Sequence, residues 1–284
     1  MAVRLSSVVF EPVMPDPAFA SIQLASIQID RSMQYSACLE WLFAAEAPDF
    51  ADRIRLAQKA GLAAVEFWHW RNKDIDAIAA ALDETGMKVA GFVAEPMVPL
   101  TDPAKHAEFL EGLKASIDVA RRLGAPVLIV QAGADLPGRT RAEQRQALSE
   151  GLARSAEILT GSGVTLAVEP LNTLVDHVGY FLPSTVEGLD IVDEVGRPEI
   201  KILYDIYHSA VMSEAIGDVL AGRVDRVAHV HLADTPGRHE PGTGVLDWQA
   251  RVAWLEANGY QGLVGLEYKP TTDTVSSLKQ VLAG

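Results

Sequence analysis

Eight apolar runs, each followed by a helix-like segment, divide the chain from Met33 onward into units of about 25–40 residues. The runs lie at residues 33–39, 63–67, 88–93, 126–131, 164–168, 200–204, 226–232 and 263–266. The segments between them have the apolar spacing of amphipathic helices, at 51–60, 75–82, 103–123, 141–159, 184–195, 212–221, 247–258 and from about 273. Strands that alternate with helices in this way form parallel sheets.

A closed barrel is the fold that this repeat predicts. A (β/α)8 TIM barrel typically needs about 250 residues, which is roughly the length of the stretch 33–284. A doubly wound open sheet is the alternative, but no G-x-G-x-x-G motif follows a predicted strand. We therefore expect an α/β protein with one TIM barrel at 33–284, preceded by an N-terminal extension at 1–32 that contains Pro12, Pro15 and Pro17.

The charge balance argues against nucleic acid as a partner. The chain has 24 Lys and Arg residues against 38 Asp and Glu residues, which gives a formal net charge of −14. Proteins that bind nucleic acid depend on Lys and Arg to neutralise phosphates. A small anionic substrate would also be repelled at long range, so it would need a local positive anchor or a metal ion.

Several features indicate a soluble cytoplasmic protein with no membrane partner. No apolar run approaches the roughly 18 residues that cross a bilayer. The N-terminus has acidic and proline residues where a signal peptide has an apolar core. The single cysteine, Cys38, excludes an intrachain disulfide. Apolar residues in the extension before Met33 suggest that the protein is a homo-oligomer.

Polar residues that can bind a metal ion end the last four predicted strands. Glu169 ends the fifth strand, Asp205 the sixth, His231 the seventh and Glu267 the eighth. Active sites of TIM barrels lie at the C-terminal ends of the strands, so these side chains should converge. One such residue alone is usually a helix cap or a solvated charge, but four in succession indicate a site. Three carboxylates and an imidazole suit Mn²⁺, Mg²⁺ or Co²⁺, and they are also compatible with Zn²⁺.

At these residues the sequence resembles the hydroxypyruvate isomerase family, within the xylose isomerase-like TIM barrel superfamily. The resemblance rests on AVEPLN (167–172), DHVGYFLPST (176–185), LYDIYH (203–208), HVHLADTPGRHEPGTG (229–244) and GLEYKP (265–270). Weaker likeness extends to SACLEWLF (36–43) and AGLAAVEF (60–67). The resemblance implies a metal-assisted isomerase of small α-hydroxycarbonyl compounds, with Glu169, Asp205, His231 and Glu267 as the metal ligands.

One departure from the family leaves two substrate classes open. At the end of the seventh strand, many hydroxypyruvate isomerases have glutamine, whereas ketose 3-epimerases of the same superfamily have histidine. With His231, this sequence resembles the epimerases at that position. The first class is hydroxypyruvate, interconverted with tartronate semialdehyde, or a slightly longer 2-oxo acid. The second is a ketose of the tagatose, allulose or ribulose type. The net charge disfavours an endonuclease with this barrel, and the complete ligand set disfavours a barrel that only binds a ligand.

Both reactions require the removal of a proton from a carbon atom beside a carbonyl group. We predict that Glu169 and Glu267 are the catalytic pair, one removing the proton and the other returning it from the opposite side of the substrate. The metal ion would stabilise the charge of the enediolate. Asp205 and His231 would serve mainly as metal ligands.

Four side chains near the strand exits are predicted substrate contacts: His208, Arg238, Lys269 and Trp68. His208 would donate a hydrogen bond to the substrate oxygen; the alternative is a solvated histidine at a helix start. Arg238 would bind a substrate hydroxyl or carboxylate, since a guanidinium contacts such groups in a planar fork; the alternative is a surface arginine. Lys269 would anchor a carboxylate. Trp68 would face the substrate or pack at the barrel rim.

Other polar and aromatic residues have simpler predicted roles. Trp41 and Trp70 have the same two possibilities as Trp68. His229 is expected to be a hydrogen-bonded core histidine, since it lies two residues before His231 on the same strand. Glu240 is a candidate partner for Arg238.

Overall fold

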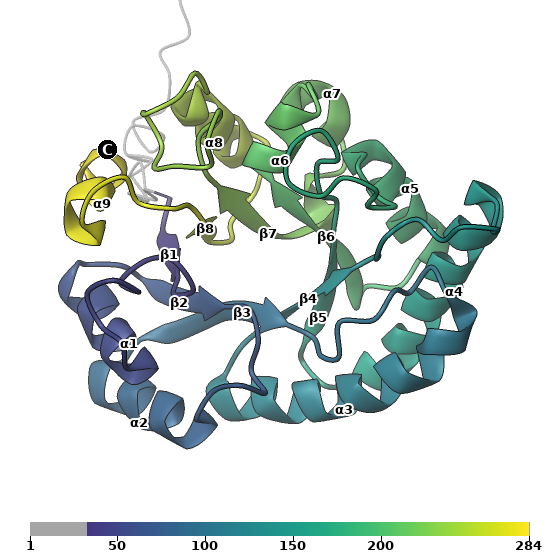
Figure 1. Ribbon diagram of the computed structural model, residues 1–284, viewed down its shortest axis with the longest axis horizontal. Coiled ribbons are helices and arrows are strands. Elements are labelled where there is room, and N and C mark those ends of the chain that lie inside the picture. The colour runs from purple at the N-terminus through teal and green to yellow at the C-terminus, as the bar shows by residue number, and fades with distance from the viewer. Residues whose placement is uncertain (1–32, 284) are drawn as a thin grey trace, which may run out of the picture. The chain divides into compact units, whose positions relative to one another are not determined.

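The computed structural model describes residues 33–283, and the barrel that they form is the one that the repeat predicts. Its eight strands are parallel and close on themselves in chain order. The helices lie outside the ring of strands (Figure 1). The extension at 1–32, and with it the apolar residues that suggest self-association, lies outside the described residues.

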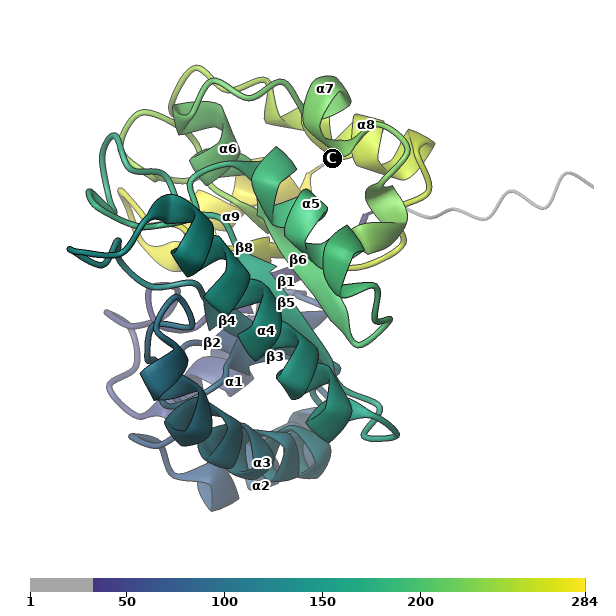
Figure 2. The same cartoon turned by 90° about the vertical axis from the view of Figure 1, so that its right-hand side faces the viewer.

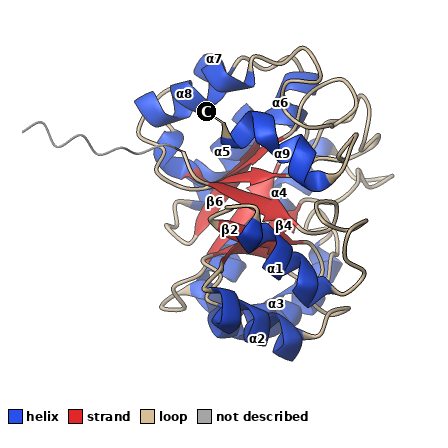
Figure 3. Cartoon of the chain, turned by 90° about the vertical axis from the view of Figure 1, so that its left-hand side faces the viewer, coloured by secondary structure: helices blue, strands red, loops and turns tan. Residues whose placement is uncertain are grey.

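The strands lie within two residues of their predicted bounds. They are β1 (Tyr35–Cys38), β2 (Ala64–Phe67), β3 (Lys88–Val93), β4 (Val127–Gln131), β5 (Thr165–Glu169), β6 (Ile200–Asp205), β7 (Val227–Leu232) and β8 (Val264–Leu266). Seen from the side, the strands are enclosed by helices on the flanks of the barrel (Figures 2 and 3).

The helices of the described residues follow the strands in the expected order. They are α1 (Phe50–Lys59), α2 (Ile75–Thr85), α3 (His106–Leu123), α4 (Arg141–Leu159), α5 (Thr185–Val195), α6 (Ile206–Val211), α7 (Ile216–Leu220), α8 (Trp248–Ala257) and α9 (Thr274–Leu282). Most begin at a side-chain cap that accepts a backbone N–H, namely Asp49, Asp74, Thr140, Ser184, Asp205, Asp247 and Asp273. Within residues 33–283, we find no helix with the length and apolar composition that a bilayer crossing requires.

The predicted helix at 212–221 begins too early: the structure has α7 at Ile216–Leu220 within that range, and a separate short helix, α6, precedes it. Asp205 caps α6 by accepting the backbone N–H of His208 at 3.0 Å, so the helix begins directly after β6. Ser213 has a φ of 62°, and a left-handed residue cannot continue a right-handed helix. α7 starts only at Ile216. His208 therefore lies in a helix that is joined to the end of β6.

The barrel interior has an apolar side and a polar side. Five aliphatic residues from β3 to β6 form a small interior cluster: Val93, Val127, Ile129, Ala167 and Leu203. The larger core fills the layer between strands and helices and includes the stacked rings of Phe67 and Phe92. By contrast, β1, β2 and β7 bury the polar residues Ser36, Glu66 and His229.

Candidate active site

A cavity of about 460 Å³ opens at the C-terminal ends of the strands. Its lining includes Glu169, His231 and Glu267 from the predicted ligand set. All four predicted substrate contacts also line it, namely Trp68, His208, Arg238 and Lys269. The structure therefore gathers these predicted residues from five of the eight strand exits around one space, where TIM barrels carry their active sites.

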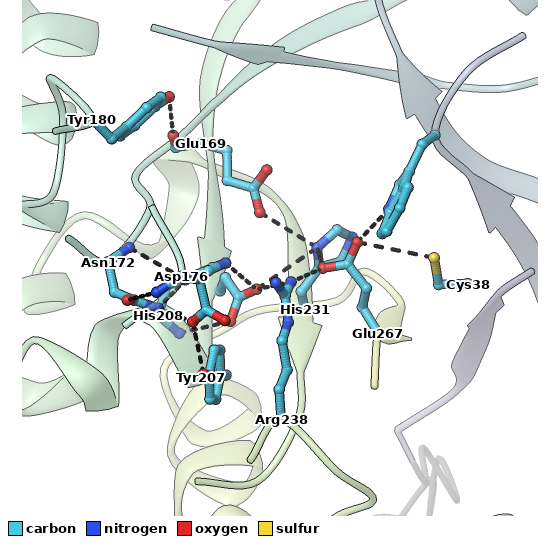
Figure 4. Close-up of polar contacts among 12 residues, drawn as sticks. Cys38, Glu169, Asn172, Asp176, Tyr180, Tyr207, His208, His231, Arg238 and Glu267 are labelled. Carbon is cyan, nitrogen blue, oxygen red and sulfur yellow. Dashed lines mark hydrogen bonds and ion pairs between the residues drawn. The ribbon is translucent and has the colours of Figure 1, made fainter. Parts of the chain in front are cut away.

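The four residues that end the last strands lie close together in the structure. One potential ligand atom from each of Glu169, Asp205, His231 and Glu267 lies within 4.8 Å of every other. His231 Nδ1 is 3.6 Å from Glu169 Oε1, 4.0 Å from Asp205 Oδ2 and 3.3 Å from Glu267 Oε2. Figure 4 shows Glu169 and Glu267 directed toward the His231 ring from different elements.

This arrangement has the chemistry of a divalent cation site. All four side chains are buried, and carboxylates packed this closely repel one another unless a cation or a proton lies between them. His231 Nδ1 faces these carboxylates and has no hydrogen-bond partner among residues 33–283. Carboxylate oxygens with an imidazole nitrogen can hold Mn²⁺, Mg²⁺, Co²⁺ or Zn²⁺.

Burial and neighbouring charges give the two predicted catalytic carboxyl groups different pKa values. Burial raises the pKa of Glu169 to about 7, against the opposing effect of His231 and with the support of the Glu267 and Asp205 charges. Burial also acts to raise the pKa of Glu267, but Arg238 and His231 outweigh it and hold that pKa well below its usual range. Two carboxyl groups with such different pKa values are typical of acid–base chemistry.

Glu267 is held from three sides. The indole N–H of Trp68 donates a hydrogen bond to Glu267 Oε1 at 2.6 Å, and the Arg238 guanidinium pairs with Oε2. The Cys38 Sγ lies 3.9 Å from Oε1. Burial raises the pKa of the Cys38 thiol, and the Glu267 charge adds to that effect, so the thiol stays protonated as a weak donor. Trp68 and Arg238 thus touch a predicted catalytic carboxylate as well as lining the cavity.

Aromatic rings support the Arg238 side chain. Its guanidinium carbon lies 4.9 Å from the ring centroid of Trp41 and 5.3 Å from that of Tyr207, which are distances of cation–π contacts. Arg238 has a φ of 54°, so the loop after β7 turns sharply at this residue. The suggested pair with Glu240 is wrong, because Glu240 instead accepts hydrogen bonds from the backbone N–H and hydroxyl of Thr271.

His208 is a buried neutral donor, so the alternative of a solvated histidine is wrong. Its Nδ1 accepts the backbone N–H of Asn172 at 3.2 Å, which places the ring proton on Nε2. Nε2 has no hydrogen-bond partner among the described residues. Burial lowers the pKa of His208 to about 4, although the Asp205 charge acts to raise it. The neutral ring therefore offers an Nε2–H donor beside the cavity.

Side-chain hydrogen bonds of Asn172 and Asp176 order the first part of the loop after β5. Asn172 Nδ2 donates to Asp176 Oδ2 at 2.7 Å, and the Tyr207 hydroxyl donates to the same oxygen at 2.7 Å. Asn172 Oδ1 in turn accepts the backbone N–H groups of Val175 and Asp176, each at 3.0 Å. Figure 4 shows this group beside His208. These hydrogen bonds therefore hold Asn172 in place, and its backbone N–H sets the tautomer of His208.

The remaining predicted contacts differ in their placement. Lys269 lines the cavity, and its Nζ lies 5.4 Å from the ring centroid of Trp41. β8 ends at Leu266, so a loop rather than a continued strand carries the lysine. Trp70 is turned away from the cavity, because its indole N–H donates to Ser116 Oγ on α3 at 3.0 Å.

Two residues of the site were not predicted. His177 lines the cavity from the loop after β5, and nothing in its local sequence separates it from an ordinary loop histidine. Glu66 is buried in β2, with its Oε2 2.7 Å from Nε2 of His229. The available signal for Glu66 was an acidic residue inside the apolar run AAVEF. This contact confirms His229 as a hydrogen-bonded core histidine.

Comparisons with known proteins agree with the barrel fold. A family model described as xylose isomerase-like TIM barrel matches residues 54–283. Hydroxypyruvate isomerase from Escherichia coli (strain K12) is 30% identical over 254 residues, which cover 87% of this chain and 97% of that protein. The 2-oxo-tetronate isomerase from Cupriavidus necator is 31% identical over 238 residues, which cover 81% of this chain and 90% of that protein.

A solved structure is similar over the same region. The crystal structure titled AP endonuclease, family 2, from Brucella melitensis has a TM-score of 0.83 and 29% sequence identity. The match covers 89% of this chain and 99% of that one.

Proposed function

We propose that this isomerase, which belongs to the xylose isomerase-like TIM barrel family and to the hydroxypyruvate isomerases within it, uses a divalent metal ion to move the carbonyl group of a small 2-oxo acid. The substrate would be hydroxypyruvate, interconverted with tartronate semialdehyde, or a similar and slightly longer 2-oxo acid. The observation that carries the proposal is the convergence of Glu169, Asp205, His231 and Glu267 beside one cavity. Relatives named for hydroxypyruvate and 2-oxo-tetronate support this substrate class.

The proposed reaction uses the two glutamates for proton transfer. A divalent cation held by Glu169, Asp205, His231 and Glu267 would supply positive charge that stabilises the enediolate. Glu169 reaches the cavity from the end of β5 and Glu267 from the end of β8, so they approach a substrate from different sides. One carboxylate would remove a proton from the hydroxyl-bearing carbon next to the carbonyl group, and the other would return a proton to the former carbonyl carbon, while the hydroxyl proton moves to the former carbonyl oxygen.

The cationic side chains of the cavity suit an acid better than a neutral sugar. Arg238 and Lys269 line the cavity from the loops after β7 and β8, and both lie over the Trp41 ring. A guanidinium and an ammonium group together can bind a substrate carboxylate against the long-range repulsion of a chain with a net charge of −14. The Nε2–H of His208 would donate to the substrate oxygen on which negative charge develops.

A ketose 3-epimerase is the second candidate, and the observation that favours it is His231. The sequence resembles the epimerases of the superfamily at this strand exit, where many hydroxypyruvate isomerases have glutamine. An epimerase would use the same two glutamates, but it would need no anchor for a carboxylate. The two candidates therefore differ at Arg238 and Lys269.

A substrate screen in D₂O tests the proposal. The purified full-length chain would be supplied with Mn²⁺, Mg²⁺ or Co²⁺ and with hydroxypyruvate, a 2-oxo-tetronate or a free ketose, and proton NMR would follow deuterium uptake beside the carbonyl group. We expect metal-dependent uptake into a 2-oxo acid together with formation of its isomer. Uptake into a ketose alone would favour the epimerase, and no uptake into any substrate would refute the proposed chemistry.

A further inference from the structure

A buried polar network lies one step deeper in the barrel than the ligand set. Its centre is the carboxylate of Glu66, which is 2% exposed. The Ser36 hydroxyl donates to Glu66 Oε2 at 2.9 Å, and His229 Nε2 lies 2.7 Å from the same oxygen. The other oxygen, Oε1, lies 3.2 Å from Nε2 of His231. One carboxylate on β2 therefore joins a serine on β1 to two histidines on β7.

The backbone around Glu66 leaves room for this carboxylate. A Cβ atom placed on Gly265 of β8 would lie 2.4 Å and 2.6 Å from the two Glu66 oxygens, so a side chain there would displace them. The register between β2 and β3 also shifts between Val65 and Glu66. Such irregularities re-aim a side chain and are frequent beside active sites.

The two ring nitrogens of His231 face different groups. Nδ1 faces the carboxylates of Glu169, Asp205 and Glu267, whereas Nε2 faces Glu66 Oε1. The Nε2 contact is off the ideal hydrogen-bond direction, and neither of its two atoms has another hydrogen-bond partner within residues 33–283. A carboxylate beside Nε2 favours the tautomer with the proton on Nε2 and the lone pair on Nδ1. That tautomer is the one that a ligand at Nδ1 requires.

We propose that Glu66 is a positioning residue that holds His231 as an Nδ1 metal ligand, while Ser36 and His229 hold Glu66 in place. The inference rests on the metal centre of the proposed function. Metal-bound histidines commonly donate their second ring N–H to a carboxylate, and loss of that partner typically weakens metal binding about 10–100-fold. Glu66 acts through His231, because it does not line the cavity.

Two substitutions and two measurements test this role in the full-length chain. Glu66→Leu removes both carboxylate oxygens, and we expect it to weaken Zn²⁺ binding about 10–100-fold in competition with a chelating dye. Glu66→Gln replaces the carboxylate with an amide of the same shape. In ¹⁵N-histidine NMR spectra it should move or remove the Nε2–H signal of His231, which is assigned by its loss in His231→Asn. A role in packing alone would not change the acceptor of that proton.

Ser36→Ala is the matched control, because it removes one hydrogen bond to Glu66 Oε2 and leaves Oε1 facing His231. Because His229 still contacts Oε2 and holds Glu66 in this variant, we expect its His231 signal and Zn²⁺ affinity to stay close to those of the wild type. An unchanged His231 signal in Glu66→Gln, or unchanged Zn²⁺ affinity in a folded Glu66→Leu, would overturn the proposal. If Glu66→Leu does not fold, the Glu66→Gln spectrum decides alone.

Two further outcomes distinguish failure of the positioning role of Glu66 from failure of the proposed metal centre. One potential ligand atom each from Glu66, His229 and His231 also lies within 4.8 Å of the others. A second Zn²⁺ per wild-type chain that disappears in Glu66→Gln would therefore make Glu66 a ligand itself and overturn its positioning role. A wild type that binds no Zn²⁺, Mn²⁺, Mg²⁺ or Co²⁺ would refute the metal centre of the proposed function. The His231 signal, recorded without metal, would then still report whether Glu66 is its acceptor.

Discussion

Replacing Trp68 with phenylalanine tests whether Glu267 depends on its indole partner. The Trp68 N–H donates a 2.6 Å hydrogen bond to Glu267 Oε1, and its ring packs edge-on against Trp41 with centroids 5.2 Å apart. Phenylalanine keeps an aromatic ring but removes the donor. A hydrogen bond to a charged group contributes about 1.5–3 kcal/mol, and about 1.4 kcal/mol corresponds to a tenfold change in rate. We therefore expect kcat/KM to fall about 10–100-fold.

Trp70→Phe is the matched control for this experiment. It removes an indole donor of the same kind, but the acceptor is Ser116 Oγ on α3, outside the cavity. Its loss should lower the free energy of unfolding by about 1 kcal/mol and leave kcat/KM near the wild-type value. Both variants would be assayed with saturating metal ion and the substrate found in the D₂O screen, and urea unfolding would measure their stability. The reasoning fails if Trp68→Phe keeps kcat/KM within about twofold of the wild type, or if Trp70→Phe loses as much.

Three further predictions follow from the same site. Lys269→Met removes the ammonium group and keeps most of the aliphatic stem, so it should abolish turnover of a 2-oxo acid; unchanged kinetics would exclude Lys269 as the anchor. Chelation with EDTA should remove isomerase activity and lower the Tm, because a ligand that binds only the folded state stabilises it; full activity after exhaustive chelation would contradict the metal centre. Gly265→Ala should destabilise the fold by about 1–3 kcal/mol in urea unfolding, because its Cβ would lie 2.4 Å from Glu66 Oε1. Gly217→Ala is the control and should not destabilise the fold, because the atom nearest to its Cβ would be 3.6 Å away. Equal stability of the two variants would show that Glu66 can move aside.

The sequence predicted the barrel and the four polar residues that end its last strands because both depend on local patterns. Apolar runs and amphipathic segments reflect the period of two in strands and of about 3.6 in helices, and each is readable without knowledge of its neighbours. Glu169 and Glu267 each follow such a run directly, and the topology of a closed barrel then brings their strand ends together. The prediction that these side chains converge therefore came from the known geometry of closed barrels, not from any single segment of the sequence.

The tertiary structure alone decided which side chains meet across the barrel. Trp68 and Arg238 reach Glu267 from the loops after β2 and β7, which are far apart in the sequence. Glu66 on β2 reaches His231 on β7 past two intervening strands. Trp70, two residues after Trp68, turns instead to α3. These contacts depend on strand register, on the shift beside Glu66 and on the space beside Gly265, each set by pairing between distant segments. A sequence pattern does not contain that pairing. It therefore predicts the strand on which a residue lies but not the side chain that the residue contacts.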